Sequence, residues 1–289
     1  MTFSFNVKGL TPQDVNTGGG GETPSTTTGG VLPKNIAGLV MCLDGEINSR
    51  SGVHDESING MQNLVYTPFI GNTSTTGVLE KLNGTPAFTD KGCTLGGTCF
   101  YPDYNDNEMT VEFCVEMTRN TEGYPLDLHF VTSRVYQGGW QIWIGDPDKT
   151  EDATTKSSVI FQAFNSNTTQ TKNTAAKFSQ TYGEKIYYTV TTKFNEANST
   201  KIYMNGELVT DLAHYEDGIA TVGDSKVNVG IGGLCNTSVE SITPTSNNPF
   251  NLGGFYGNYL KWYMFRKWSR QLSPEEIKQN YLQDKKRFG

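Results

Sequence analysis

Glu112 and Glu116 are the carboxylates of this sequence whose placement comes nearest to a hydrolytic pair. Glycoside hydrolysis uses two carboxyl groups, one as the acid and the other as nucleophile or base. Both glutamates lie in the stretch 110–117, where they alternate with apolar side chains: Val111, Phe113, Val115 and Met117. In a strand this alternation turns the apolar residues inward and both glutamates outward. We interpret the glutamates as the solvated face of a half-buried strand.

Other catalytic patterns are missing from the sequence. His54, His129 and His214 are scattered and lie near no serine or cysteine nucleophile motif. The glycine runs do not follow a strand and open a helix, as phosphate-binding loops do. The sequence therefore predicts a protein that is not an enzyme, with no catalytic residue and no required cofactor.

A short acidic segment offers oxygen ligands for calcium. Asp103, Asn105 and Asn107 supply carboxylate and amide oxygens, which suit this ion. The segment lacks the glycine and the terminal glutamate of an EF-hand loop. Two interpretations stay open: a calcium site built from these three residues, or ordinary solvated turns.

Five aromatic residues are candidates for carbohydrate binding, because a flat ring can cover the apolar face of a sugar. All five lie in loop-like surroundings that are rich in glycine or aspartate: Tyr101, Tyr104, Tyr136, Phe255 and Tyr256. Each of them fits packing at the rim of the fold equally well.

The first 35 residues differ in composition from the rest of the chain. Phe3, Phe5 and Val7 alternate with polar residues, which indicates a strand without a local partner. Residues 17–30 are rich in Gly, Thr and Ser and have the composition of a flexible tether. We expect this arm, residues 1–35, to add a strand to a neighbouring subunit's sheet and to fill pockets there with the three apolar side chains. The alternative is a frayed terminus.

The charge and cysteine content narrow the function classes. A net charge of −7 over 289 residues argues against a nucleic-acid partner. Residues 261–289 hold eight Lys or Arg against three Asp or Glu, which we attribute to a solvated helix face and last turn. Five cysteines indicate reduced thiols, although Cys93 and Cys99 could pair if oxidised. No export signal begins the sequence and no stretch of 18 apolar residues occurs, so we expect neither Sec export nor a membrane partner.

The remaining residues, 36–289, indicate an all-β domain with one helix. Short alternating segments follow one another, and Asn205-Gly206 can supply the two positive φ angles of a hairpin turn. Residues 260–268 are apolar on both alternating faces, as in an inner strand. Ser273, Pro274 and Glu276 form a helix start signal, and we expect a helix over 273–288. The prediction is a two-sheet antiparallel jelly-roll sandwich closed by a C-terminal helix.

Several of these segments resemble laminin G-like domains of the concanavalin A-like lectin/glucanase superfamily. Residues 268–277 (WSRQLSPEEI) are similar to the family ending Y-N-R-x-L-S-x-x-E-I, with departures at Trp268 and Ser269. Asp44-Gly45 ends a strand as in the family, and residues 202–208 match its h-Y-h-N-G-x-h hairpin. The resemblance covers residues 36–289 and implies a lectin-like sandwich, often with calcium at its rim. Hydrolases of the superfamily carry Glu-x-Asp-x-Glu or Glu-x-Asp-x-x-Glu on one strand, and this sequence has no such run.

A lectin-like domain behind a short arm resembles bacteriophage head-fibre, capsid-decoration and tail-fibre proteins. The resemblance implies a non-enzymatic virion protein, made in the host cytoplasm and held on capsid or tail subunits through its arm. It also implies a host surface glycan as a partner and allows a homo-oligomer. Two alternatives stay open: a free calcium-dependent lectin and a divergent glycoside hydrolase.

Overall fold

The computed structural model describes the helix, most of the strands and the segments beside them. The described residues are 32–49, 51–57, 61, 63–64, 80–81, 87–89, 91–94, 99–104, 108–117, 128–132, 140–145, 157–164, 171–178, 183–194, 196, 199–209, 212–214, 226–231 and 260–289. The division into an arm and a domain at residue 35 stays a prediction, because the described part of the chain begins at residue 32.

The described strands form two antiparallel sheets. The first sheet runs in the order β13 (Glu207–Leu208), β12 (Lys201–Met204), β11 (Lys185–Lys193), β6 (Glu108–Met117), β16 (Leu260–Trp268), β4 (Gly92–Thr94) and β3 (Ala87–Thr89), with β1 (Leu39–Asp44) also paired to β16. The second sheet runs in the order β14 (Leu212–His214), β10 (Thr171–Phe178), β9 (Ser157–Phe164), β8 (Trp140–Gly145), β7 (Leu128–Thr132), β15 (Lys226–Ile231), β5 (Cys99–Tyr104) and β2 (Glu80–Lys81).

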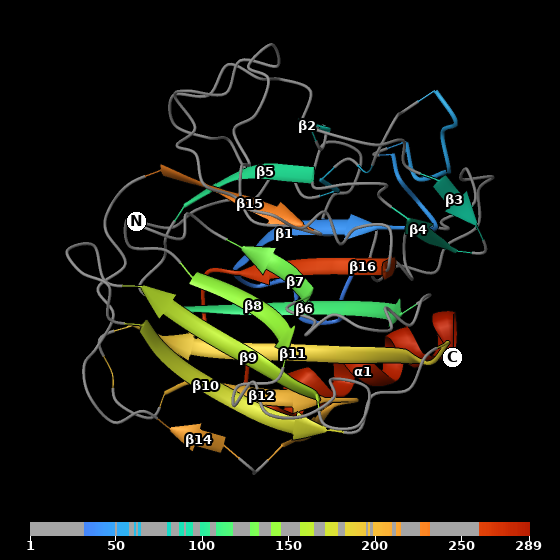
Figure 1. The fold of residues 1–289 in the computed structure, drawn as a ribbon. Coiled ribbons are helices and arrows are strands. Elements are labelled where there is room, and N and C mark those ends of the chain that lie inside the picture. Colours follow the sequence, from blue (N-terminus) through green and yellow to red (C-terminus); the bar gives the residue numbers. More distant parts are fainter. Residues whose placement is uncertain are drawn as a thin grey trace, which may run out of the picture.

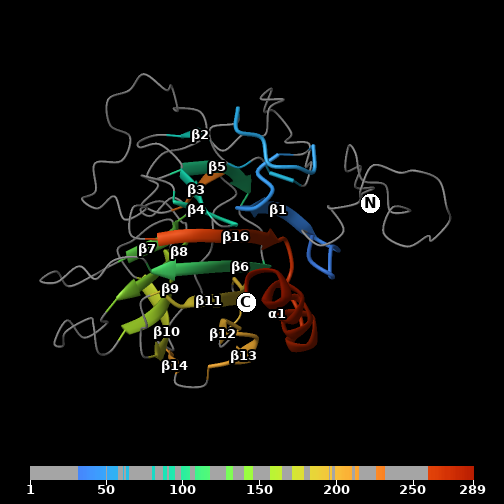
Figure 2. The same cartoon turned by 90° about the vertical axis from the view of Figure 1, so that its right-hand side faces the viewer.

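The two sheets and the helix α1 (Pro274–Phe288) make three layers. Figure 1 shows the strands of the two sheets lying over one another, and Figure 2 shows α1 on the side of the first sheet that faces away from β7, β8, β9 and β10. The predicted all-β sandwich of jelly-roll type with one C-terminal helix is confirmed.

The main core lies between the sheets. Strand β6 contributes Val111, Phe113 and Val115, all of them buried, as the alternation predicts. Strands of the opposite sheet supply Trp140, Ile142, Val159, Phe161 and Ile231. Full burial of such side chains contributes about 1.5–3 kcal/mol each. The alternating apolar positions therefore fix which face of each strand meets the other sheet.

The outer face of the first sheet is covered, which the sequence reading did not anticipate for β6. Glu112 was expected to be solvated, but only 2% of its surface is exposed, because α1 lies over it. The basic charge of residues 261–289 was attributed to a solvated helix face and last turn. Lys285 and Lys286 in the last turn of α1 are exposed, but Arg266 and Lys267 on β16 are fully buried and the side chain of Arg287 is 13% exposed. The helix thus converts a polar sheet face into an interior layer.

Helix α1 begins as the sequence indicates. The Ser273 hydroxyl accepts a hydrogen bond from the Glu276 N–H at 3.2 Å, and the Glu276 carboxylate accepts one from the Ser273 N–H at 2.8 Å. This reciprocal pair satisfies two backbone donors that the helix leaves open. Ile277 and Phe288 turn toward the sheet and are buried.

Two strands differ from the sequence reading. Strand β10 has few β-branched residues and was not predicted, yet it pairs with β9 along its whole length from Thr171 to Phe178. Strand β5 extends to Tyr104, where a loop was expected, because Tyr101 and Asp103 pair with Val229 and Val227 of β15. Tertiary pairing overrides weak local propensity in both cases.

Three cysteine side chains lie among the described residues. Cys42, Cys93 and Cys114 are buried. The side chain of Cys99 lies outside the described residues, so the Cys93–Cys99 pair stays a prediction. In the part of the chain that the structure describes, no helix is long and apolar enough to cross a membrane.

Candidate functional site

A buried ion-pair network fixes α1 to the first sheet. The guanidinium of Arg266 on β16 donates to both carboxylate oxygens of Asp284 on α1, at 2.6 and 2.9 Å. The Glu112 carboxylate lies 3.8 Å from Arg266 and accepts two hydrogen bonds of 3.2 Å from the Asn280 amide. All four side chains are shielded from solvent. A bidentate arginine–carboxylate pair has one preferred geometry, so it sets the position of the helix.

A second ion pair holds the last turn of α1 to the end of β1. Arg287 lies 2.9 Å from Asp44 and 3.0 Å from Glu46. Asp44 also accepts from the N–H groups of Glu46 and Ile47 at 2.9 and 3.0 Å, which shapes the turn after the strand. At Gly45 a Cβ atom would lie 2.8 Å from a backbone oxygen. The Asp44-Gly45 pair noted in the sequence is therefore a structural turn.

Burial shifts the acidity of these carboxylates. Desolvation raises the pKa of Glu112 to about 8, although Arg266 and the Asn280 amide lower it in part. Desolvation also raises the pKa of Asp44, against the lowering effect of Arg287. Burial therefore favours the neutral form of the Glu112 carboxyl group, which is enclosed beneath a helix.

Glu112 and Glu116, the carboxylates that come nearest to a hydrolytic pair in the sequence, thus have structural roles. Glu112 contacts only protein groups under α1, and Glu116 accepts a hydrogen bond of 2.6 Å from the Tyr263 hydroxyl. A substrate cannot reach Glu112 without displacing the helix. The structure does not bring these two residues together on an open face.

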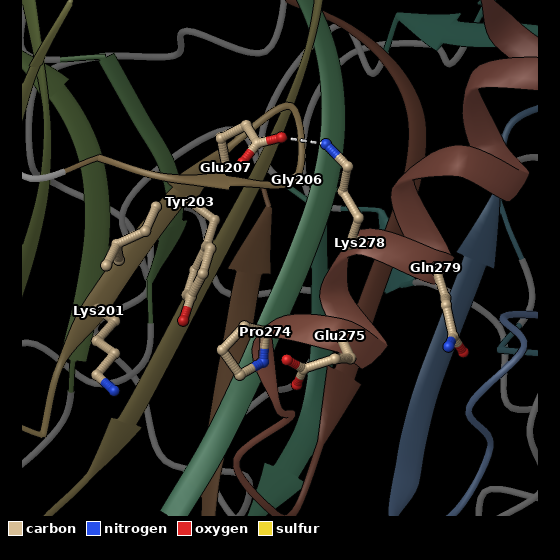
Figure 3. A pocket seen from close by; sticks show the side chains of 9 residues that line it. Lys201, Tyr203, Gly206, Glu207, Pro274, Glu275, Lys278 and Gln279 are labelled. Carbon is tan, nitrogen blue, oxygen red and sulfur yellow. Dashed lines mark hydrogen bonds and ion pairs between the residues drawn. The ribbon is translucent and has the colours of Figure 1, made fainter.

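A groove lies on the other side of α1, between its first two turns and the β12–β13 hairpin. The hollow has a volume of about 550 Å³ and is lined by Lys201, Tyr203, Gly206, Glu207, Leu208, Pro274, Glu275, Lys278 and Gln279. This volume falls within the ~300–1,000 Å³ range of small-ligand sites. Figure 3 shows the two walls, joined at one end by an ion pair between Glu207 and Lys278.

Several polar groups in the groove have no protein partner. Within the described residues, no hydrogen bond or ion pair is made by the Tyr203 hydroxyl or by the side chains of Lys201, Glu275 and Gln279. Tyr203 is 3% exposed, and Figure 3 shows its hydroxyl pointing between Lys201 and Pro274. Its pKa is raised, first by burial and then by the charge of Glu275. A hydroxyl without a protein partner, on a mostly buried side chain and beside unpaired charges, is an arrangement that a polar ligand would complete.

The hairpin turn positions one wall of the groove. Asn205 and Gly206 have φ angles of 51° and 75°, as the sequence predicts for a two-residue turn. A Cβ atom at Gly206 would lie 2.9 Å from Tyr281 and 3.1 Å from Lys278 on α1. The turn therefore packs directly on the helix, and glycine allows both the φ angle and the close approach.

Gly183 provides a matched control for this contact, because its φ angle is also 75° but a Cβ atom there would meet nothing within 4 Å. We expect Gly183→Ala to lower the free energy of unfolding by about 1–2 kcal/mol, the cost of a left-handed alanine. We expect Gly206→Ala to lower it by about 2–4 kcal/mol, because overpacking against the helix adds to that cost. Urea unfolding measures both. Equal losses would contradict close packing of the turn on α1.

The structure describes only part of the site residues expected from the sequence. Tyr101, Asp103 and Tyr104 lie in strand β5, not in the loop that was expected, and their side chains lie outside the described residues. Eight further candidates fall outside the described residues: Tyr136, Phe255 and Tyr256 for carbohydrate, Phe3, Phe5 and Val7 of the arm, and Asn105 and Asn107 for calcium. Their roles stay predictions.

The groove residues were missed by sequence reading. The two local signals on either side of the groove, the Asn205-Gly206 turn and the Ser273 helix start, are both visible in the sequence. What is not visible is that these two segments meet, since 71 positions separate Glu207 from Lys278. In the described ranges, no group of three or more His, Cys, Asp or Glu residues is placed to hold a metal ion.

Comparisons with known proteins concern the fold. No protein-family model matches the sequence, and no curated protein matches it. Among solved structures, a Trypanosoma rangeli sialidase in complex with a difluorinated keto-deoxy-nononic acid has a TM-score of 0.52 at 13% identity, covering 86% of this chain and 33% of that one. The receptor binding domain of botulinum neurotoxin C/D mosaic serotype has a TM-score of 0.50 at 14% identity, covering 85% of this chain and 51% of that one.

The chain shares its β-sandwich fold with these solved structures. A T. rangeli sialidase in complex with sialic acid has a similar fold, with a TM-score of 0.51 at 12% identity. The chain spans about a third to a half of the length of these solved structures. At such identities the likeness concerns the fold alone, and the laminin G-like resemblance stays a prediction.

Proposed function

We propose that this chain is a non-enzymatic carbohydrate-binding module. The observation that carries this proposal is the groove, where the Tyr203 hydroxyl, Lys201 and Glu275 have no hydrogen-bond or ion-pair partner among the described residues. Sugars are recognised by a few convergent polar groups beside apolar carbon. The sandwich is also the fold shared with a protein described as a receptor binding domain.

The proposal also concerns where the module is displayed. We propose that it is displayed on a virus particle as a capsid-decoration or fibre protein, touching glycans of the host surface. The support is compositional: the Gly/Thr/Ser-rich tether at 17–30 and the alternating apolar residues Phe3, Phe5 and Val7 before it. The partners are then capsid or tail subunits, bound through the arm, with a second copy of the chain as a further partner.

Two measurements test this function. A glycan array probed with the labelled protein should give binding to a defined set of oligosaccharides, and the absence of binding to every glycan would overturn carbohydrate recognition. Co-sedimentation with assembled particles should be lost when residues 1–30 are deleted, since the arm is proposed to make the contact. If the chain that lacks residues 1–30 still sediments with the particles, anchoring through the arm is overturned.

A calcium-dependent lectin is a second candidate, favoured by one observation. Asp103 lies near the end of β5, and Asn105 and Asn107 follow on the connection from β5 in one sheet to β6 in the other. These three residues supply the carboxylate and amide oxygens that calcium prefers. Glycan binding that chelator abolishes and calcium restores would support this candidate, whereas binding that is indifferent to chelator would exclude it.

Glycoside hydrolysis by Glu112 is not expected. The Glu112 side chain lies under α1 and hydrogen bonds to Asn280. We expect no turnover of sialosides or neutral polysaccharides above that of the Glu112→Gln variant. Turnover by the natural chain that falls at least a hundredfold in this variant, while binding to the array is kept, would contradict the non-enzymatic proposal.

A further inference from the structure

The charged groups of the groove sum to zero. Lys201 and Lys278 carry positive charge, while Glu207 and Glu275 carry negative charge. Glu207 and Lys278 pair with each other across one end. This leaves one ammonium, that of Lys201, and one carboxylate, that of Glu275, for a ligand.

These two charges flank the partnerless hydroxyl. In Figure 3 the Tyr203 hydroxyl points into the gap that has Lys201 on one side and Pro274 and Glu275 on the other. The raised pKa of Tyr203, caused in part by the charge of Glu275, reflects their proximity. The groove thus presents a cationic donor, a hydroxyl that both donates and accepts, and an anionic acceptor in one row.

An apolar surface lies next to this row. Leu208 is 44% exposed on β13, and Pro274 is exposed at the start of α1. The aliphatic C–H face of a pyranose ring can cover such carbon atoms, while its hydroxyl groups turn toward the polar row. A groove with one apolar edge and mixed polar groups matches a sugar better than it matches a uniformly charged ligand.

We propose that the groove binds a neutral sugar through adjacent hydroxyl groups and discriminates against acidic sugars. This inference rests on the proposed carbohydrate-binding function and names the ligand class and the residues of its site. One sugar hydroxyl accepts from Lys201, the next donates to Glu275, and Tyr203 bonds between them. Hydroxyl groups can act as both donor and acceptor, so they satisfy both charged groups at once.

An acidic sugar fits this row less well. Its carboxylate can pair with Lys201, but Glu275 also lines the groove with an unpaired negative charge, and like charges in a partly desolvated groove repel. Discrimination of this kind comes from the repulsive group as much as from the attractive one. Glu275 is therefore the specificity-determining residue.

The test compares matched neutral and sialylated glycans, with lactose and sialyllactose as one pair, on an array and then by calorimetric titration. The natural chain should prefer the neutral members. Glu275→Gln should weaken neutral binding about tenfold, the usual effect of losing one charge-assisted hydrogen bond, and narrow the preference. Tyr203→Phe should weaken neutral binding about threefold to tenfold. Glu276 makes the helix cap, so Glu275→Gln leaves the helix start intact.

Glu196→Gln is the matched control, since Glu196 is exposed and pairs with Lys193 outside the groove. It should bind like the natural chain. Thermal unfolding of each variant checks that the fold is kept. Binding that groove variants leave unchanged, or a preference for the sialylated members, overturns the groove inference and leaves carbohydrate binding standing. No binding to any glycan overturns both.

Discussion

Replacing Arg266 with methionine should lower the free energy of unfolding by about 3–5 kcal/mol, the usual cost of removing one partner from a buried ion pair. Arg266 is fully buried, and its guanidinium holds Asp284 at 2.6 and 2.9 Å. Without it, Asp284 and Glu112 face each other beneath the helix with the nearest cation gone. Urea unfolding followed by circular dichroism measures the loss.

Arg270 offers the matched control. It makes a similar two-point contact with Glu276, at 2.8 and 2.6 Å, but the side chains are 27% and 25% exposed. Partly exposed pairs of this kind contribute about 1 kcal/mol or less. Arg270→Met should therefore cost far less than Arg266→Met. Similar losses in the two variants would show that burial of the Arg266–Asp284 pair does not anchor α1.

The second large effect concerns pH. Burial raises the pKa of Glu112 from 4.5 to about 8, so the folded chain keeps a proton on Glu112 that the unfolded chain loses above pH 4.5. Stability contributed by the neutral acid is complete below pH 4.5 and is lost as the pH rises toward 8. At ~1.4 kcal/mol per unit, the loss is on the order of 3–5 kcal/mol between pH 5 and 8. Denaturant unfolding at several pH values measures it.

The groups facing Glu112 shape this titration. Arg266 comes from β16, while Asn280, Asp284 and Glu276 come from α1. Burial also raises the pKa of Asp44, so the contribution of Asp44 to the free energy of unfolding likewise falls as the pH rises. Arg270 lowers the pKa of Glu276, so the stability that this carboxylate contributes is lost as the pH falls in the acid range. A window from pH 5 to 8 isolates the contribution of Glu112 from the thiols and phenols.

Glu112→Gln is the decisive variant, because glutamine resembles the neutral acid and keeps an oxygen for the Asn280 amide. Its free energy of unfolding should match that of the natural chain near pH 5 and exceed it near pH 8. Glu116→Gln makes the same substitution on the same strand, at a partly exposed side chain that is hydrogen bonded to Tyr263, and serves as the matched control for the change itself. If the free energy of unfolding of Glu112→Gln still falls between pH 5 and 8, the pH dependence belongs to other groups.

These stability effects bear on the proposed binding function. The first two turns of α1 form one wall of the groove, and the β12–β13 hairpin forms the other. The network around Arg266 holds the helix against the sheet, so it sets the width of the groove without touching a ligand. A module anchored in this way presents its free polar groups in a fixed geometry, which limits the entropy lost on binding.

The local features of the fold could be predicted from the sequence because they depend on neighbouring residues. The Asn205-Gly206 turn, the Ser273–Glu276 cap and the alternation at Val111, Phe113 and Val115 each lie within a few positions of one another. Each is present in the structure where the sequence indicates it. These features were enough to predict two antiparallel sheets and a closing helix.

The sequence determined the C-terminal helix, several of the strand segments with their inward faces, and the sharp turn at Asn205-Gly206. Only the tertiary structure decided that Glu112 is buried, that Arg266 meets Asp284, and that the hairpin and helix enclose a groove. The physical reason is that alternation tells which residues share a face but not what covers that face. A third layer supplied by a segment more than a hundred positions away, as Asn280 is from Glu112, reverses the environment of a polar residue.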